Sequence, residues 1–188
     1  INKERSVWLF KLLNISYKNN MKFVHIADIH FDAPFISLNG KEYLVNQRKL
    51  EQRNVFKKVI EYIKKENIDY LFISGDLYEN EHIQKSTIDF INTQFESIPN
   101  TKIFITPGNH DPYIKGAFYD TYKFANNVNI FKKSNVEKYS DENIEIYGLA
   151  FNDFYMHANP LENFYPEENN KFKVLIMHAD LNGTKDRE

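Results

Sequence analysis

The sequence predicts a layered α/β domain, and three features of the chain support this prediction. Apolar runs of strand length recur without polar alternation, which is typical of strands buried on both faces. Segments with apolar residues at helical spacing separate these runs. Each run also ends abruptly in glycine, proline or a chargeable residue. Strands that alternate with helices in this way indicate a parallel sheet covered on both faces.

The individual elements follow from the same patterns. Buried strands are expected at 22–27, 69–74, 102–106 and 172–177. An amphipathic helix is expected over 45–66, with its apolar face formed by Val55, Phe56, Val59, Ile60 and Ile63. A second helix is expected near 83–97, and residues 136–148 predict a β-hairpin with a polar turn.

Composition limits the classes of function. At 188 residues and 22.4 kDa the chain is most simply one domain, with the apolar content of an ordinary soluble globular protein. A net charge of −2 offers no overall attraction to nucleic acid or to membranes. The absence of cysteine excludes disulfides, thiolate zinc sites and a cysteine nucleophile, and it fits a cytoplasmic protein. No apolar run approaches the roughly 20 residues of a membrane span.

The first twenty residues allow two interpretations. They start without methionine and end in a polar run before Met21, so they are interpreted as an extension of doubtful relevance ahead of a domain at 21–188. Alternatively they form a short amphipathic helix through Trp8, Leu9, Leu12 and Leu13, whose spacing suits one helical face.

Polar residues follow four of the expected strands. They are Asp28 and His30 after the first, Asp76 after the second, Asn109, His110 and Asp111 after the third, and His178 after the last. Ligands of open α/β sheets bind outside the carboxyl ends of the strands. We therefore expect these side chains to converge at one edge of the sheet.

The residue types point to metal. Carboxylate, imidazole and amide oxygen without sulfur suit Mn²⁺, Fe²⁺ or Zn²⁺. A central aspartate can bridge two ions about 3.5–4 Å apart, an arrangement used for displacement at phosphorus. Gly75 and Gly108 precede Asp76 and Asn109, which suggests tight turns close to the ions.

The ordered motifs D-x-H at 28–30, G-D at 75–76, G-N-H-D at 108–111 and a later strand ending in His178 resemble the calcineurin-like metallophosphoesterases. Within that family, MKFVHIADIHFDAPF followed by LFISGDLYEN is most similar to bacterial DNA-repair exonucleases of the SbcD and YhaO kind. The resemblance covers roughly residues 21–180, and it implies a β-sandwich flanked by helices.

The resemblance also implies a role for each motif residue. Asp28 and His30 would bind a first metal and Asp76 would bridge. Asn109 and His178 would bind the second metal. His110 would contact the phosphate and stabilise or protonate the leaving oxygen, with Asp111 orienting its ring.

The function implied is a metal-dependent phosphodiesterase, namely the DNA exonuclease or endonuclease module of a repair complex, which uses a hydroxide activated by two metals. Mn²⁺ is the first expectation, with Fe²⁺ or Zn²⁺ as alternatives, and an SMC-like ATPase is the implied partner. Two other hypotheses remain open. One is a phosphoesterase of nucleotides or other small molecules, and the other is an inactive fragment that binds metal weakly.

The chain departs from the family pattern at one point. The pattern ends with G-H-x-H on a later strand, one imidazole for each ion, and these 188 residues contain no such motif. The expectation is therefore a domain truncated at its C-terminus, in which His82 or His157 could replace a missing ligand.

Several further residues carry weaker signals. His25 is expected to be a satisfied core or face residue, and His82 and His157 surface residues. Asp32 is expected either to support the site by hydrogen bonding or to be exposed. Tyr78 is expected either to line the substrate groove or to pack in the core. The aromatic residues over 118–124 are expected to pack in the core rather than to stack on nucleic-acid bases.

Overall fold

The computed structural model describes residues 21–35, 40–156 and 159–179, and it contains two β-sheets and three helices within these ranges. The strands are β1 (Phe23–Ile26), β2 (Tyr70–Ser74), β3 (Lys102–Thr106), β4 (Val128–Ile130), β5 (Glu137–Ser140), β6 (Ile144–Gly148) and β7 (Phe172–Ile176). The helices are α1 (Glu42–Glu66), α2 (Lys85–Glu96) and the single turn α3 (Phe118–Thr121). Residues 1–20, including the expected helix of Trp8 and Leu12, lie outside the described residues.

The first sheet is parallel and has the strand order β1-β2-β3-β4. Its register pairs Ile26 with Ile73, and Ser74 with Thr106. All four strands run in the same direction, so their carboxyl ends meet at one edge.

The second sheet has the order β5-β6-β7 and is mixed. β5 and β6 form the expected antiparallel hairpin, whereas β7 pairs with β6 in parallel. Because β7 runs parallel to β6, it must be reached by a crossover connection, which here is the long segment between Gly148 and Phe172.

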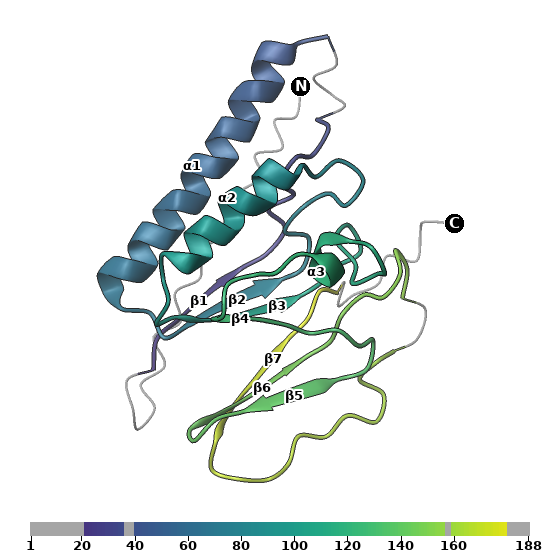
Figure 1. The fold of residues 1–188 in the computed structure, drawn as a ribbon. Helices are drawn as coiled ribbons and strands as arrows, with labels where there is room; N and C mark the ends of the chain where they lie inside the picture. Colours follow the sequence, from purple (N-terminus) through teal and green to yellow (C-terminus); the bar gives the residue numbers. More distant parts are fainter. Residues whose placement is uncertain (1–20, 36–39, 157–158, 180–188) are drawn as a thin grey trace, which may run out of the picture.

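The two sheets and the helices form three layers (Figure 1). α1 and α2 cover one face of the first sheet, and the second sheet lies against the opposite face. Alternation along the strands explains this arrangement. In β2, Leu71 and Ile73 face the helices, while Tyr70 and Phe72 face the second sheet. The aliphatic side chains of β2 therefore pack under the helices, and its aromatic side chains fill the space between the sheets.

The intersheet core is centred on Phe104. Its ring lies 4.8 Å from Tyr139 of β5 in an edge-to-face contact and 6.2 Å from both Phe72 and Phe131. Aromatic pairs at such distances stabilise a core beyond the area that they bury. Phe104 is 1% exposed, so both sheets depend on this side chain.

The predicted fold class is confirmed, as a mixed α/β fold with layered sheets flanked by helices. The expected strands and the two long helices are present, with ends that differ by up to three residues. Two details differ from the expectation. The second face of the parallel sheet is covered by another sheet, which agrees with the β-sandwich implied by the resemblance but not with the helices that the apolar pattern alone predicted on both faces. In addition, β4 was not expected.

Candidate metal centre

The segments that follow β1 and β2 have unusual backbone conformations. Asp28, His30 and Asp32 have φ angles of 55°, 52° and 62°, and Asp76 has φ 53°. L-residues other than glycine rarely adopt this left-handed region, which costs about 1 kcal/mol or more per residue. Such strain persists only where the surrounding structure enforces it, and it concentrates at functional sites.

Backbone hydrogen bonds enforce this conformation. The loop after β1 runs alongside the loop after β2, with the amide of Asp28 donating to Gly75 O at 3.2 Å and that of His30 to Asp76 O at 2.9 Å. From α1, the Gln52 side-chain amide donates to Ile29 O at 2.9 Å. The side chains of Asp28, His30 and Asp76 are therefore held close together before any ligand binds.

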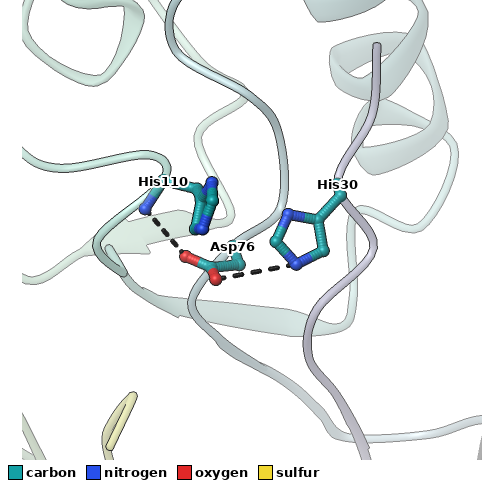
Figure 2. A group of neighbouring side chains, drawn as sticks. All are labelled: His30, Asp76 and His110. Carbon is teal, nitrogen blue, oxygen red and sulfur yellow. Dashed lines mark hydrogen bonds and ion pairs between the residues drawn. The ribbon is translucent and has the colours of Figure 1, made fainter. Parts of the chain in front are cut away.

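Asp76 lies at the centre of the convergent side chains (Figure 2). Its carboxylate is buried, with Oδ1 accepting the His110 backbone N–H at 3.0 Å. Its Oδ2 lies 3.6 Å from His30 Nε2 and 3.3 Å from His178 Nε2. Burial alone would raise the pKa of Asp76, but the His178 hydrogen bond and the His110 N–H outweigh it and lower the pKa. Asp76 is therefore an ionised carboxylate shared by groups on both sides.

His178 brings a ligand from the second sheet. Its Nδ1 lies 3.1 Å from the backbone carbonyl of Ser74, which can only accept, so Nδ1 carries a proton. Its Nε2 faces two more oxygens, Asp76 Oδ2 and Asn109 Oδ1 at 3.1 Å. A neutral Nε2 lone pair would repel both oxygens, so this position requires a proton or a cation.

Two glycines allow this close packing. A Cβ on Gly108 would lie 2.3 Å from Asp76 Oδ1 and 2.8 Å from the Asp76 amide nitrogen. A Cβ on Gly75 would lie 2.6 Å from the His178 side chain, and Gly75 also has a φ of 76°. The glycines expected from the sequence to allow tight turns thus lie directly against the candidate ligands.

Asp111 has a role different from the one expected. It is fully buried, and its carboxylate accepts the backbone N–H groups of Gly108, Asp76 and Leu77 at 2.7–2.9 Å and the Tyr119 hydroxyl at 2.8 Å. These four bonds occupy both oxygens and fix the loops after β2 and β3. The expectation that Asp111 orients the His110 ring is wrong, because Glu79 makes that contact.

Glu79 was missed by the sequence analysis. Its Oε1 lies 2.7 Å from His30 Nδ1 and its Oε2 lies 2.9 Å from His110 Nδ1. The available signal was its position, since it lies three residues beyond Asp76 in the same strand-exit loop. Glutamate in a polar loop is common enough that its type alone carried no prediction.

The ligand atoms form two groups that share Asp76. One contains His30, Asp76 and His110, and the other contains Asp28, Asp76 and His178; within each, the ligand atoms lie within 4.8 Å of one another. The structure thus brings together all the residues expected to bind metal, with Asn109 against His178. Asp28 falls beside His178, although the expectation paired it with His30.

The structure also places the residues for which the sequence left more than one interpretation open. Tyr78 is fully buried and packs on Tyr119 at 5.0 Å, so it lines no groove. Asp32 is 5% exposed and accepts the Gln84 amide, which supports the hydrogen-bonding interpretation. His25 lies exposed on β1, with Nε2 2.8 Å from Ser74 Oγ.

The remaining expectations concern residues away from the two groups. His82 is exposed and belongs to neither group of candidate ligands among the described residues, and His157 lies outside those residues. The aromatic residues over 118–124 pack on the core cluster under the helices, as expected.

Comparison with known proteins assigns the chain to a family. The model of the calcineurin-like phosphoesterases matches residues 21–187, which is most of the chain. The chain belongs to the calcineurin-like phosphoesterase family. Members of this family are hydrolases that use divalent metals, and the two groups around Asp76 offer the mixed imidazole and oxygen ligands that such ions require.

Relatives within the family are similar at low identity. The chain is 22% identical to the uncharacterized metallophosphoesterase YhaO of Bacillus subtilis over 88% of its own length, and 26% identical to a subunit of the nuclease SbcCD of Staphylococcus epidermidis over 88%. It is 23% identical to the DNA double-strand break repair protein Mre11 of Saccharolobus solfataricus over 69%. These alignments cover 42%, 48% and 33% of the relatives, so the chain spans less than half of each.

No helix among the described residues is long and apolar enough to cross a membrane. The longest, α1, carries charged residues along its length.

Proposed function

We propose that this phosphoesterase hydrolyses phosphodiester bonds in DNA, with two divalent cations bound around Asp76. The observation that supports this proposal most directly is that electron-pair donors converge on the Asp76 carboxylate. The Nε2 atoms of His30 and His178 both face Asp76 Oδ2, at 3.6 Å and 3.3 Å, and Asn109 Oδ1 lies beside the second imidazole. Donors that face one another in this way are stabilised by cations.

The residues divide into two ligand sets in this proposal. His30 serves the first ion, Asn109 and His178 serve the second, and Asp76 serves both. Asp28 is assigned to the first ion, as the sequence predicted, although its carboxylate also lies within 4.8 Å of His178. When bound, the ions polarise the phosphoryl oxygens and supply a nucleophile at neutral pH. Mn²⁺ is the proposed metal, because carboxylate and amide oxygens outnumber the imidazoles among these ligands.

His110 is the proposed contact to the phosphate. Its side chain is 45% exposed and its backbone N–H is anchored on Asp76, so its ring lies at the open side of the site. Burial alone would lower the pKa of His110, but the Glu79 hydrogen bond and the Asp76 charge outweigh it and raise the pKa. A raised pKa favours the protonated ring, which stabilises the leaving oxygen or gives it a proton.

DNA is proposed as the substrate because two of the relatives are named as a nuclease component and a DNA double-strand break repair protein. The SbcCD relative is named as one subunit of a nuclease, so a partner subunit is part of the proposal. The resemblance seen in the sequence makes an SMC-like ATPase the proposed partner. We also propose a cytoplasmic location, which the absence of cysteine fits.

The test is hydrolysis of linear duplex DNA and of a generic diester, bis(p-nitrophenyl) phosphate, with Mn²⁺ and with chelator. Manganese-dependent cleavage of both substrates is expected. Cleavage of the diester alone would support a small-molecule phosphoesterase and contradict the DNA proposal. Cleavage of neither substrate by a protein that binds Mn²⁺ would support the inactive-fragment hypothesis.

A substitution of Asp76 tests whether this residue binds both metal ions. Asp76→Ala removes the shared carboxylate, so manganese binding by calorimetry should be lost along with activity. Asp153→Ala, which removes an exposed carboxylate elsewhere, is the control and should bind like the wild type. Two ions retained by Asp76→Ala would contradict the bridging role.

A further inference from the structure

Tyr119 connects the helical layer to the loops of the candidate metal centre. It belongs to the single turn α3, downstream of the loop after β3, and it is only 4% exposed. Its hydroxyl donates a hydrogen bond to Asp111 Oδ2 at 2.8 Å. Among the described residues, this is the one side chain that donates to the Asp111 carboxylate, because the other three donors are backbone amides.

Asp111 holds the backbone on two sides of the metal centre. Its Oδ1 accepts the amides of Gly108 and Asp76 at 2.7 Å and 2.9 Å, and its Oδ2 accepts the amide of Leu77 at 2.8 Å. Gly108 directly precedes Asn109 in the chain. A displacement of this carboxylate would therefore move the backbone of Asp76 and the loop that carries Asn109.

The hydroxyl completes the hydrogen bonds of the Asp111 carboxylate. Each oxygen accepts two bonds, and on Oδ2 the second bond comes from Tyr119. Asp111 is fully buried, so bulk solvent does not supply another donor in place of the hydroxyl. Without the hydroxyl, Oδ2 keeps only the bond from Leu77, and the carboxylate is free to turn away from the amides that it holds.

The surrounding structure fixes the position of the hydroxyl. The ring of Tyr119 packs on Tyr78 and Phe124, whose centroids lie 5.0 Å and 6.0 Å away. Tyr122, which directly follows α3, donates its hydroxyl to Asp89 of α2 at 2.9 Å. The core and the helical layer thus hold Tyr119 in place, so its hydroxyl needs little further ordering to support the centre.

We propose that Tyr119 is a positioning residue of the metal centre. It acts through Asp111, whose carboxylate keeps the backbone of Asp76 and the loop that carries Asn109 in the geometry that binds both ions. Tyr119 is buried and does not contact the substrate itself. The inference rests on the proposed function for the part that the ions have in hydrolysis, whereas the hydrogen bonds and the metal affinity are measured without any substrate.

The first test compares Tyr119→Phe with Tyr78→Phe. Each substitution removes one buried hydroxyl and keeps the ring, but the Tyr78 hydroxyl has no hydrogen-bond partner among the described residues. Manganese affinity, measured by calorimetry, should fall about tenfold in Tyr119→Phe, the lower end of the usual effect of losing outer support at a metal site. It should stay at the wild-type value in Tyr78→Phe. Equal affinity in the wild type and both variants would overturn the proposal.

The second test separates positioning from stability. In ¹H–¹⁵N spectra of the metal-free proteins, the amide signals of Gly108, Asp76 and Leu77 should move further in Tyr119→Phe than in Tyr78→Phe. With bis(p-nitrophenyl) phosphate at saturating Mn²⁺, kcat should fall in Tyr119→Phe with little change in KM, because the residue touches no substrate. A lower melting temperature with unmoved amide signals and unchanged affinity would mean that Tyr119 only stabilises the fold, which contradicts the proposal.

The third test uses the wild-type protein alone. The hydroxyl proton of Tyr119, assigned from its nuclear Overhauser effects to its own ring, should exchange slowly with water because it is buried and bonded to Asp111. Rapid exchange would overturn the proposal even if Tyr119→Phe failed to fold. If the wild type binds Mn²⁺ but cleaves no phosphodiester, while the affinity and the amide signals change as expected, the proposed function fails and this inference stands.

Discussion

At the scale of single residues, His178 is the most informative group. Burial alone would lower its pKa, but the hydrogen bond and the charge of Asp76 outweigh this effect and raise the pKa to about 9. The metal-free protein therefore holds a proton on His178 at neutral pH. A metal ion placed against the same Nε2 must displace that proton, so binding and protonation compete.

This competition predicts a pH dependence of metal binding. Below the folded pKa of about 9, each Mn²⁺ bound at His178 releases a proton, so affinity should rise with pH. The expected slope is up to about tenfold per pH unit between pH 7 and 9, levelling off above. Calorimetry in buffers of different ionisation enthalpy measures both affinity and proton release. An affinity that is flat over this range would contradict a protonated His178.

The same pKa shift predicts the stability of the metal-free protein. The folded pKa of His178 is raised above the unfolded value of about 6.5, so the ion pair with Asp76 stabilises the fold fully below pH 6.5. This stabilisation is lost as the pH rises through about 9. Urea unfolding in chelator should show the loss in the wild type and its absence in His178→Ala.

Gly108 tests how tightly the centre is packed. A methyl group there would lie 2.3 Å from Asp76 Oδ1, which is held by the His110 amide and cannot retreat freely. Gly108→Ala should cost about 1–3 kcal/mol of unfolding free energy, as overpacking usually does, and should weaken manganese binding. Gly116→Ala is the control, because its φ of 86° costs stability while nothing lies within 4 Å of the new methyl. Equal metal affinity in both variants would refute the clash.

The residue types at this centre could be predicted, but their partners could not. The five expected ligands stand out because polar residues are uncommon directly after buried strands; they are Asp28, His30, Asp76, Asn109 and His178. The contacts of Asp111 and Glu79 depend on side chains that point from different loops, and loop direction has no periodic signal in a sequence. The assignment of each ligand to one ion stays a prediction.

At the scale of elements, Asp32 connects the strained loop after β1 to the helices. Its carboxylate accepts the amide of Gln84, which precedes α2, at 3.1 Å and lies 3.6 Å from Lys49 on α1. The loop that carries His30 is therefore held against the helical layer by a buried acid.

Asp32→Ala should leave the Gln84 amide without this acceptor and should lower the free energy of unfolding by about 1–3 kcal/mol, the cost of losing a buried partner. Urea denaturation measures this loss. Asp32→Asn keeps one oxygen acceptor and tolerates the left-handed backbone better than alanine, so it should lose less. Equal stability of the two variants would mean that the hydrogen bond contributes nothing.

The helices and strands that were predicted correctly are those with long apolar patterns in the sequence. α1 and the buried strands β2 and β3 have continuous apolar runs or repeated helical spacing, and their type follows from these alone. β4 has three half-buried residues and pairs only with β3, so its short segment carries no recognisable period. Which face of β2 meets the helices and which meets the second sheet could not be predicted from its apolar run, because both faces of this strand are buried and apolar.

At the scale of the whole molecule, the candidate metal centre joins the two sheets. Asp76 and Asn109 follow strands of the first sheet, whereas His178 follows β7 of the second. Apart from this centre, the sheets are held together mainly by the apolar core around Phe104. A cation shared by Asp76, Asn109 and His178 would therefore stabilise the packing of one layer on the other.

This arrangement predicts that Mn²⁺ stabilises the entire fold. At a hundred times its dissociation constant, an ion that binds only the folded state adds about 2.7 kcal/mol, or about 5–11 °C in melting temperature for a domain of this size. Scanning calorimetry of the wild type and of Asp76→Ala measures the shift, which should vanish in the variant. Hydrogen exchange then shows which elements the ion stabilises. The amides of β7 should exchange more slowly with Mn²⁺, because His178 holds the end of that strand; slowing confined to the loops after β1, β2 and β3 would mean that the ion does not join the sheets.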